Sequence, residues 1–112
     1  MHATRLVRAD LQNASLLYAD LSESVLEDAN LQGCLMVRAN LTRANLRRAK
    51  MGGASLTGAT LVDADFSFAD LSGAGLFGAE TDGAVFEQAN LEGARFGKFR
   101  SSPREADSRE VG

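Results

Sequence analysis

Side chains that could take part in catalysis are few in this chain, and their spacing matches no catalytic arrangement. His2 is the single histidine, so a triad built on a histidine base is not available within the body of the chain. Cys34 is the single cysteine, and without a cysteine and histidine cluster there is no zinc-ligand pattern. Asp63 and Asp65 are paired carboxylates, but we expect both to point outward from a regular surface without a pocket. The sequence therefore predicts a protein that is not an enzyme and needs no metal ion or other cofactor.

Charged side chains, which could bind an oppositely charged partner, are arranged in blocks, although the formal net charge is only −3. All charged residues from 10 to 28 are acidic, and so are all those from 63 to 92. Between these blocks lie five basic residues that we call the basic belt: Arg38, Arg43, Arg47, Arg48 and Lys50. The belt is either a solvated surface that favours solubility or a contact surface for an acidic partner.

The elements that must position these side chains follow a repeat of five residues. Every fifth residue from Ala9 to Ala94 is small, and every fifth residue from Leu11 to Phe96 is a large hydrophobe except Thr81. Residues five apart differ by about 140° around a helix, and they point to opposite faces of a straight strand. Neither element can bury both series, so the chain must turn within each repeat and stack its coils in a solenoid.

Six segments place aspartate or asparagine between an alanine and a leucine: Ala9-Asp10-Leu11, Ala19-Asp20-Leu21, Ala29-Asn30-Leu31, Ala39-Asn40-Leu41, Ala69-Asp70-Leu71 and Ala89-Asn90-Leu91. These segments resemble the A-[D/N]-L-x-x signature of pentapeptide-repeat proteins, and the match covers about four fifths of the chain. The resemblance implies an all-β fold, a right-handed quadrilateral β-helix with four repeats per coil and about four to five coils. It implies no single function, because the same fold serves proteins of unknown role and some inhibitors of bacterial DNA gyrase.

Both ends of the chain depart from the repeat. We divide the sequence into an N-terminal lead-in of residues 1–8, a repeat body of residues 9–98 and a flexible polar tail of residues 99–112. The chain shows neither the apolar stretch of a signal peptide nor a run long enough for a membrane helix. Cys34 occupies an alanine slot and has no disulfide partner, which favours a buried thiol in a cytoplasmic protein.

With four repeats per coil, residues twenty apart stack in columns, and one of the four faces carries no carboxylate. This acid-free face is centred on residues 16, 36, 56, 76 and 96. Its large outward hydrophobes are Leu17, Tyr18, Leu35, Val37 and Phe77. They either stabilise one another as a ladder across the coils or form an interface with another molecule.

The C-terminal end of the solenoid raises the question of what covers its last coil. A terminal coil leaves backbone groups and core side chains uncovered, and Phe96 and Phe99 lie at this end. One interpretation is that these rings fold back over their own coil as a local plug. The other is an end-to-end homodimer closed by a two-fold axis, which resembles the behaviour of several family members. We expect the homodimer, because the polar tail offers little cover.

These features favour a non-enzymatic protein–protein interaction or structural module that binds an unidentified protein. The alternative, by resemblance to gyrase-protecting members of the family, is a DNA-mimicking regulator of a type II topoisomerase, DNA gyrase. Mimicry needs extended negative potential, and this chain is short, mildly acidic and interrupted by the basic belt. We expect neither direct binding to nucleic acid nor insertion into a membrane.

Overall fold

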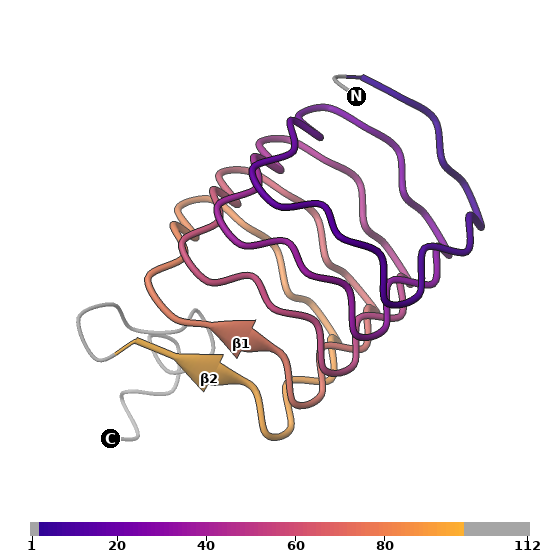
Figure 1. Ribbon diagram of the computed structural model, residues 1–112. Coiled ribbons are helices and arrows are strands. Elements are labelled where there is room, and N and C mark those ends of the chain that lie inside the picture. Colours follow the sequence, from indigo (N-terminus) through magenta and orange to yellow (C-terminus); the bar gives the residue numbers. More distant parts are fainter. Residues whose placement is uncertain (1–2, 98–112) are drawn as a thin grey trace.

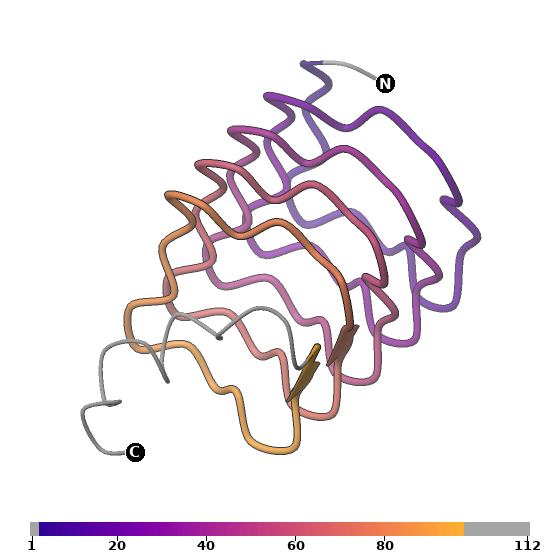
Figure 2. The same ribbon diagram turned by 90° about the vertical axis from the view of Figure 1, so that its left-hand side faces the viewer.

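The computed structural model describes residues 3–97, which wind into a right-handed quadrilateral β-helix (Figure 1). Parallel bridges join residues twenty positions apart, from Arg5 with Val25 to Asp70 with Asn90. Four five-residue repeats therefore make one coil, and the described residues complete between four and five coils. Figure 2 shows the same coils from the side, stacked along a single axis. The predicted fold class is confirmed.

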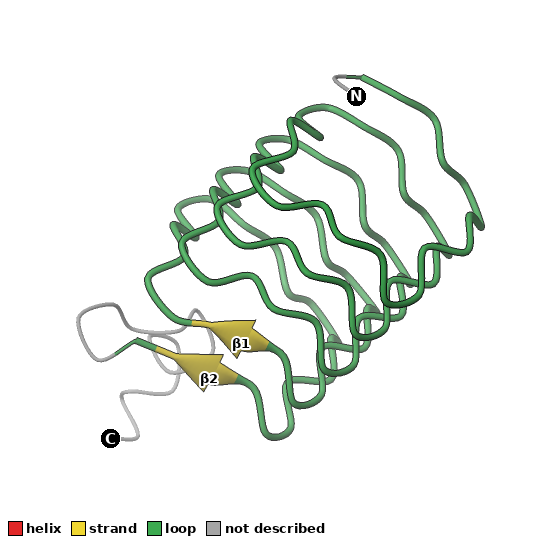
Figure 3. Cartoon of the chain, viewed as in Figure 1, coloured by secondary structure: helices red, strands yellow, loops and turns green. Residues whose placement is uncertain are grey.

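Regular strands are very short in this fold, because the chain turns after every short extended segment. Strand β1 (Gly75–Leu76) pairs in parallel with strand β2 (Arg95–Phe96), with Gly75 opposite Arg95 and Leu76 opposite Phe96. Everywhere else in residues 3–97 the coils are joined by isolated bridges, and no helix occurs there (Figure 3). The absence of helix from the described repeats agrees with the five-residue period.

Backbone hydrogen bonds join each coil to both of its neighbours. In one representative repeat, the Leu31 amide donates to the Lys50 carbonyl of the next coil at 2.6 Å. The Asn30 amide donates to the Ala9 carbonyl of the previous coil at 2.8 Å. Within the repeat, the Cys34 amide donates to the Leu31 carbonyl at 3.1 Å and closes the turn. Each coil therefore depends on the coils above and below it, as expected for a solenoid.

The hydrophobic and small series both point inward and form one continuous core. From Leu21 to Ala79 every residue of the two series is buried. Ser24, which replaces an alanine, is also buried, and its hydroxyl oxygen accepts a hydrogen bond from the Thr4 amide at 3.1 Å. This arrangement explains why one series is small and the other large, because the alanine slots lie at corners where the chain turns.

The residue before each small slot adopts a left-handed backbone conformation. Seven of these turn residues are glycines, for example Gly53 with φ of 70°, and glycine has no steric penalty there. Bulky residues take the same conformation, including Tyr18 with φ of 60° and Phe68 with φ of 62°. The surrounding ladder imposes this geometry on L-residues that rarely adopt it.

Core side chains in the two terminal coils are only partly covered. They are Leu6, Leu11 and Leu16 in the first coil and Phe86, Leu91 and Phe96 near the other end. Residues 3–8 of the lead-in already belong to the first coil, since the Leu6 amide donates to the Val25 carbonyl at 2.7 Å. Phe99 and the tail lie outside the described residues, so the structure places only Phe96 of the expected end contact.

Candidate interaction surfaces

The groups that could have done chemistry are separated from one another. The Cys34 thiol is fully buried, and burial raises its pKa, so the thiol stays protonated at neutral pH. Asp63 and Asp65 lie on either side of the buried Ala64 and belong to different faces. Among residues 3–97, no group of three or more histidine, cysteine, aspartate or glutamate side chains could hold a metal ion. The same residues include no helix with the length and apolar character needed to cross a bilayer.

The aspartate or asparagine of each signature segment has a specific structural role that sequence reasoning missed. Its side-chain oxygen accepts a hydrogen bond from the backbone N–H two residues later, as from Thr42 to Asn40 at 3.0 Å. Eight described repeats contain this cap, with acceptors Asp10, Asp20, Asn30, Asn40, Asn45, Asp65, Asp70 and Asn90. The capped N–H is the one amide of the repeat that donates to no backbone carbonyl. A short acceptor two residues before an unpaired amide is the usual sign of an Asx turn.

The acid-free face lacks this cap in every coil. The residues in the acceptor slot are Ser15, Leu35, Ser55, Gly75 and Arg95. Within residues 3–97, the amides of Leu17, Val37 and Thr57 have no hydrogen-bond partner. In the capped repeats of the other faces, such as that of Asn40, an outward side chain reaches the equivalent amide, so this N–H is turned toward the outer surface. Some repeats of those faces also lack the cap, including the one that contains Val62. The described part of the face therefore presents a column of backbone donors without hydrogen-bond partners.

Large apolar side chains are concentrated on the acid-free face. Leu17, Leu35 and Phe77 are 47%, 45% and 44% exposed, and Tyr18 is 71% exposed. Val37 is half-buried between its column neighbours. The two other exposed large hydrophobes of the described residues, Phe68 and Val85, lie on the opposite face. The structure thus brings the predicted interface residues together on one side of the rod.

Arginines supply the only charges on the described part of the acid-free face. Arg38 and Arg95 are both exposed, and Arg38 has no ion-pair partner within residues 3–97. Gly58 lies beneath the Arg38 side chain, because a Cβ atom at Gly58 would be 3.2 Å from the Arg38 Cγ atom. The glycine therefore leaves room for the arginine stem to lie along the face, with its guanidinium available for other contacts.

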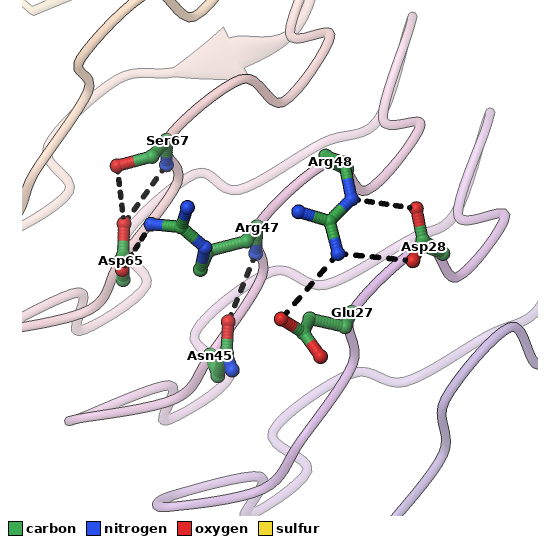
Figure 4. A network of polar contacts seen from close by, with 7 residues as sticks. All are labelled: Glu27, Asp28, Asn45, Arg47, Arg48, Asp65 and Ser67. Atoms are coloured by element: carbon green, nitrogen blue, oxygen red, sulfur yellow. Dashed lines mark hydrogen bonds and ion pairs between the residues drawn. The ribbon is translucent and has the colours of Figure 1, made fainter.

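The basic belt is a ring around one coil, and most of it pairs with carboxylates of neighbouring coils. Arg43 contacts Glu23 of the previous coil, with 2.8 Å between nitrogen and oxygen. Arg48 lies 3.1 Å from Asp28 and 3.5 Å from Glu27 (Figure 4). These side chains are substantially exposed, so solvent screens each pair and the pairs contribute little to stability.

Arg47 pairs with a carboxylate of the next coil, whereas Arg43 and Arg48 pair with carboxylates of the previous coil. Its guanidinium lies 3.4 Å from Asp65 of the next coil (Figure 4) and 5.5 Å from the centre of the Phe68 ring. Partial burial raises the pKa of Asp65, but hydrogen bonds from the Ser67 hydroxyl and amide and from Arg47 outweigh it. The pKa of Asp65 therefore lies below its ordinary value, and the carboxylate is charged at neutral pH.

The ring arrangement separates the belt residues. Arg38 lies on the acid-free face, Arg43 on the next face, Arg47 and Arg48 on the opposite face, and Lys50 on the fourth. Arg38 and Lys50 make no ion pair within the described residues. The belt is consequently not one continuous basic patch, although its residues are close together in sequence.

Comparison with known proteins agrees with the geometry of the coils. A family model for pentapeptide repeats matches residues 4–43, 39–76 and 69–98, with eight copies of the repeat. These matches span most of the chain, so the chain belongs to the pentapeptide repeat family. A search of curated proteins found no match.

Solved structures of other family members have the same fold. A pentapeptide repeat protein from the cyanobacterium Cyanothece 51142 is 36% identical, with a TM-score of 0.79 over 80% of this chain and 61% of that one. A pentapeptide repeat protein from the Arabidopsis thaliana thylakoid lumen is 26% identical, with a TM-score of 0.88 over 99% of this chain and 78% of that one. A pentapeptide repeat protein from Nostoc PCC 7120 is 35% identical, with a TM-score of 0.64 over 84% and 78%. This chain therefore spans less than two thirds of the cyanobacterial Cyanothece protein.

Proposed function

We propose that this pentapeptide-repeat solenoid is a non-enzymatic protein–protein interaction module, and that the acid-free face is its contact surface. One observation carries the proposal. Four of the six exposed large hydrophobes in the described residues lie on the one face that has no carboxylate. Contiguous apolar surface of this kind marks interaction sites on proteins that are otherwise covered with polar groups.

The competing interpretation, a ladder of side chains that stabilises only the solenoid itself, accounts for part of the face. Val37 is half-buried in its column, as such a ladder requires. Leu17, Leu35 and Phe77 nevertheless remain 47%, 45% and 44% exposed after the coils have stacked. Because close to half of each side chain stays in water, packing between coils does not account for these hydrophobes.

Affinity capture tests the proposed surface. The parent protein and two double variants are immobilised and incubated with a native lysate. We expect Leu17→Ser with Phe77→Ser to lose the captured protein, while Phe68→Ser with Val85→Ser on the opposite face retains it. The second pair is the matched control, since both pairs replace exposed hydrophobes. Equal capture by both double variants would show that the acid-free face is not the contact surface.

A second candidate function is regulation of DNA gyrase through mimicry of DNA. The acidic surface of one face next to the acid-free face supports this candidate. This face carries five carboxylates, Asp20, Glu23, Asp63, Glu80 and Asp82, and Arg43 as the single cation among its described residues. Such a surface has the negative potential that mimicry needs. A supercoiling assay with added protein is the test. We expect inhibition by the parent and its loss in Asp63→Asn with Asp82→Asn, and a parent without effect removes this candidate.

A further inference from the structure

We propose that the acid-free face binds an extended acidic segment of a partner protein. This inference rests on the proposed function and deepens it by naming the partner's chemistry. Three properties of the same face support it: unpaired backbone donors, unpaired positive charge and exposed apolar side chains. Each property selects a complementary feature of the bound segment.

The unpaired backbone amides of the acid-free face can donate hydrogen bonds to acceptors of a bound segment. The N–H groups of Leu17, Val37 and Thr57 form one column, with one donor per coil and about 4.8 Å between neighbouring coils. On other faces the same amide is satisfied by the carboxylate of Asp65 or Asp70 from its own repeat. The local geometry of this N–H therefore suits a carboxylate oxygen. A glutamate or aspartate of a partner would occupy the position that the chain's own acceptor takes elsewhere.

The charge pattern restricts where an acidic segment can lie. Arg38 and Arg95 give the acid-free face a local charge of +2 among the described residues. Within residues 3–97, the face that follows it along the chain carries five carboxylates and one arginine, and the face that precedes it carries Asp10, Asp70 and Glu92 with Lys50. Both neighbours therefore repel an acidic ligand, so the ligand is confined to the acid-free face.

The apolar side chains indicate a polypeptide and not a nucleic acid. Leu17, Leu35 and Phe77 gain from contact with aliphatic or aromatic side chains, which a phosphate backbone does not provide. Nucleic-acid binding also depends on many phosphate contacts, and the part of this face within residues 3–97 offers two arginines. An extended segment that alternates acidic and apolar residues satisfies all three properties together.

The probe is a capped hexapeptide of alternating glutamate and leucine, labelled with a fluorophore and followed by fluorescence anisotropy. Hexapeptides with lysine or glutamine in place of glutamate are the controls. We expect the glutamate peptide to bind, the affinity to fall as salt is added, and the lysine peptide not to bind. Arg38→Gln should weaken binding about fivefold. Absence of binding at about 1 mM glutamate peptide, or equal binding of the lysine peptide, overturns the proposal.

One substitution isolates the role of the amides. Ser55→Asn places an acceptor two residues before Thr57, as Asn40 is placed before Thr42, and caps the Thr57 amide. We expect this variant to be more stable than the parent and to bind the glutamate peptide about fivefold more weakly. Ser55→Leu has a side chain of the same shape without an acceptor, and Leu35 already occupies the same slot one coil away. It should bind at least as tightly as the parent.

Thr60→Asn is the control for stability alone, because it would cap the Val62 amide on the neighbouring face. It should raise stability and leave peptide affinity unchanged. Parent-like binding by Ser55→Asn overturns the assigned role of the amides. If light scattering shows that a second copy occupies the face, the acidic-segment proposal is also overturned. Loss of lysate capture in Leu17→Ser with Phe77→Ser, without any peptide binding, would leave the proposed function standing and reject only the acidic partner.

Discussion

A single polar atom in each repeat decides whether one backbone amide is paired. Asn40 accepts hydrogen bonds from the Thr42 amide at 3.0 Å and from the Thr42 hydroxyl at 2.6 Å. We expect Asn40→Ala to lower the free energy of unfolding by about 1–2 kcal/mol, because the amide loses its acceptor. Thr60→Ala is the control, since Thr60 occupies the same slot one coil later and makes no such cap. Urea denaturation of the two variants checks this, and equal losses would contradict it.

The Asp65 carboxylate should make stability depend on acid pH. Its pKa is lower in the folded protein than the ordinary value of about 3.9, so folding favours the charged form. The resulting stabilisation is present above pH 4 and is lost as the pH falls through the folded pKa. Asp65→Asn keeps an acceptor for the Ser67 amide but loses the charge. The parent should therefore be more stable than Asp65→Asn at pH 7, and the difference should shrink toward pH 2. A difference that does not change with pH would contradict this.

Thr81 is the polar exception in the hydrophobic series, and the structure explains how it is tolerated. Its side chain is half-buried near the last coil, and its hydroxyl has no hydrogen-bond partner within residues 3–97. We expect Thr81→Leu to raise the free energy of unfolding by roughly 1 kcal/mol, because it adds apolar contact without removing a bond. Thermal unfolding is the measurement. A lower melting temperature would mean that the hydroxyl has a specific role.

At the scale of the coil, side-chain size is restricted at the corners. Ala54 is buried in the core, so a larger side chain there would have to displace its neighbours. Ala54→Leu should cost about 1–3 kcal/mol or more through overpacking. Ser55→Leu places the same side chain one residue later in an outward slot and should change stability by less than about 0.5 kcal/mol. Denaturant unfolding of both variants compares the two slots directly, and similar losses would argue against a corner restriction.

The whole molecule is a stack of coils whose ends differ from its middle. Phe86, Leu91 and Phe96 near the C-terminal end are less covered than equivalent residues in the central coils. We expect a second copy to cover this end, so light scattering should show a dimer that Phe96→Asp disrupts and Phe77→Asp retains. A dimer lost only in Phe77→Asp would move the interface to the acid-free face. A parent that stays monomeric at high concentration would exclude both.

Much of the architecture is determined by the sequence alone. The five-residue period excludes a helix and a straight strand, since neither buries both the alanine and the leucine series. It therefore predicts a solenoid, inward positions for residues such as Leu46 and Ala54, and buried Cys34. These features follow from the sizes of the side chains at neighbouring positions. That size pattern is visible within each five-residue repeat, and it recurs without interruption along the chain.

Only the tertiary structure determines which residues of neighbouring coils contact one another. A period of five does not say how many repeats complete a turn, and the bridges between residues twenty apart supply that number. That number brings Arg43 to Glu23 and separates Arg38 from the other belt residues onto different faces. It also aligns the unpaired amides of Val37 and Thr57 in one column. Such contacts depend on the rotation of the chain between coils, and side-chain periodicity along the sequence does not determine that rotation.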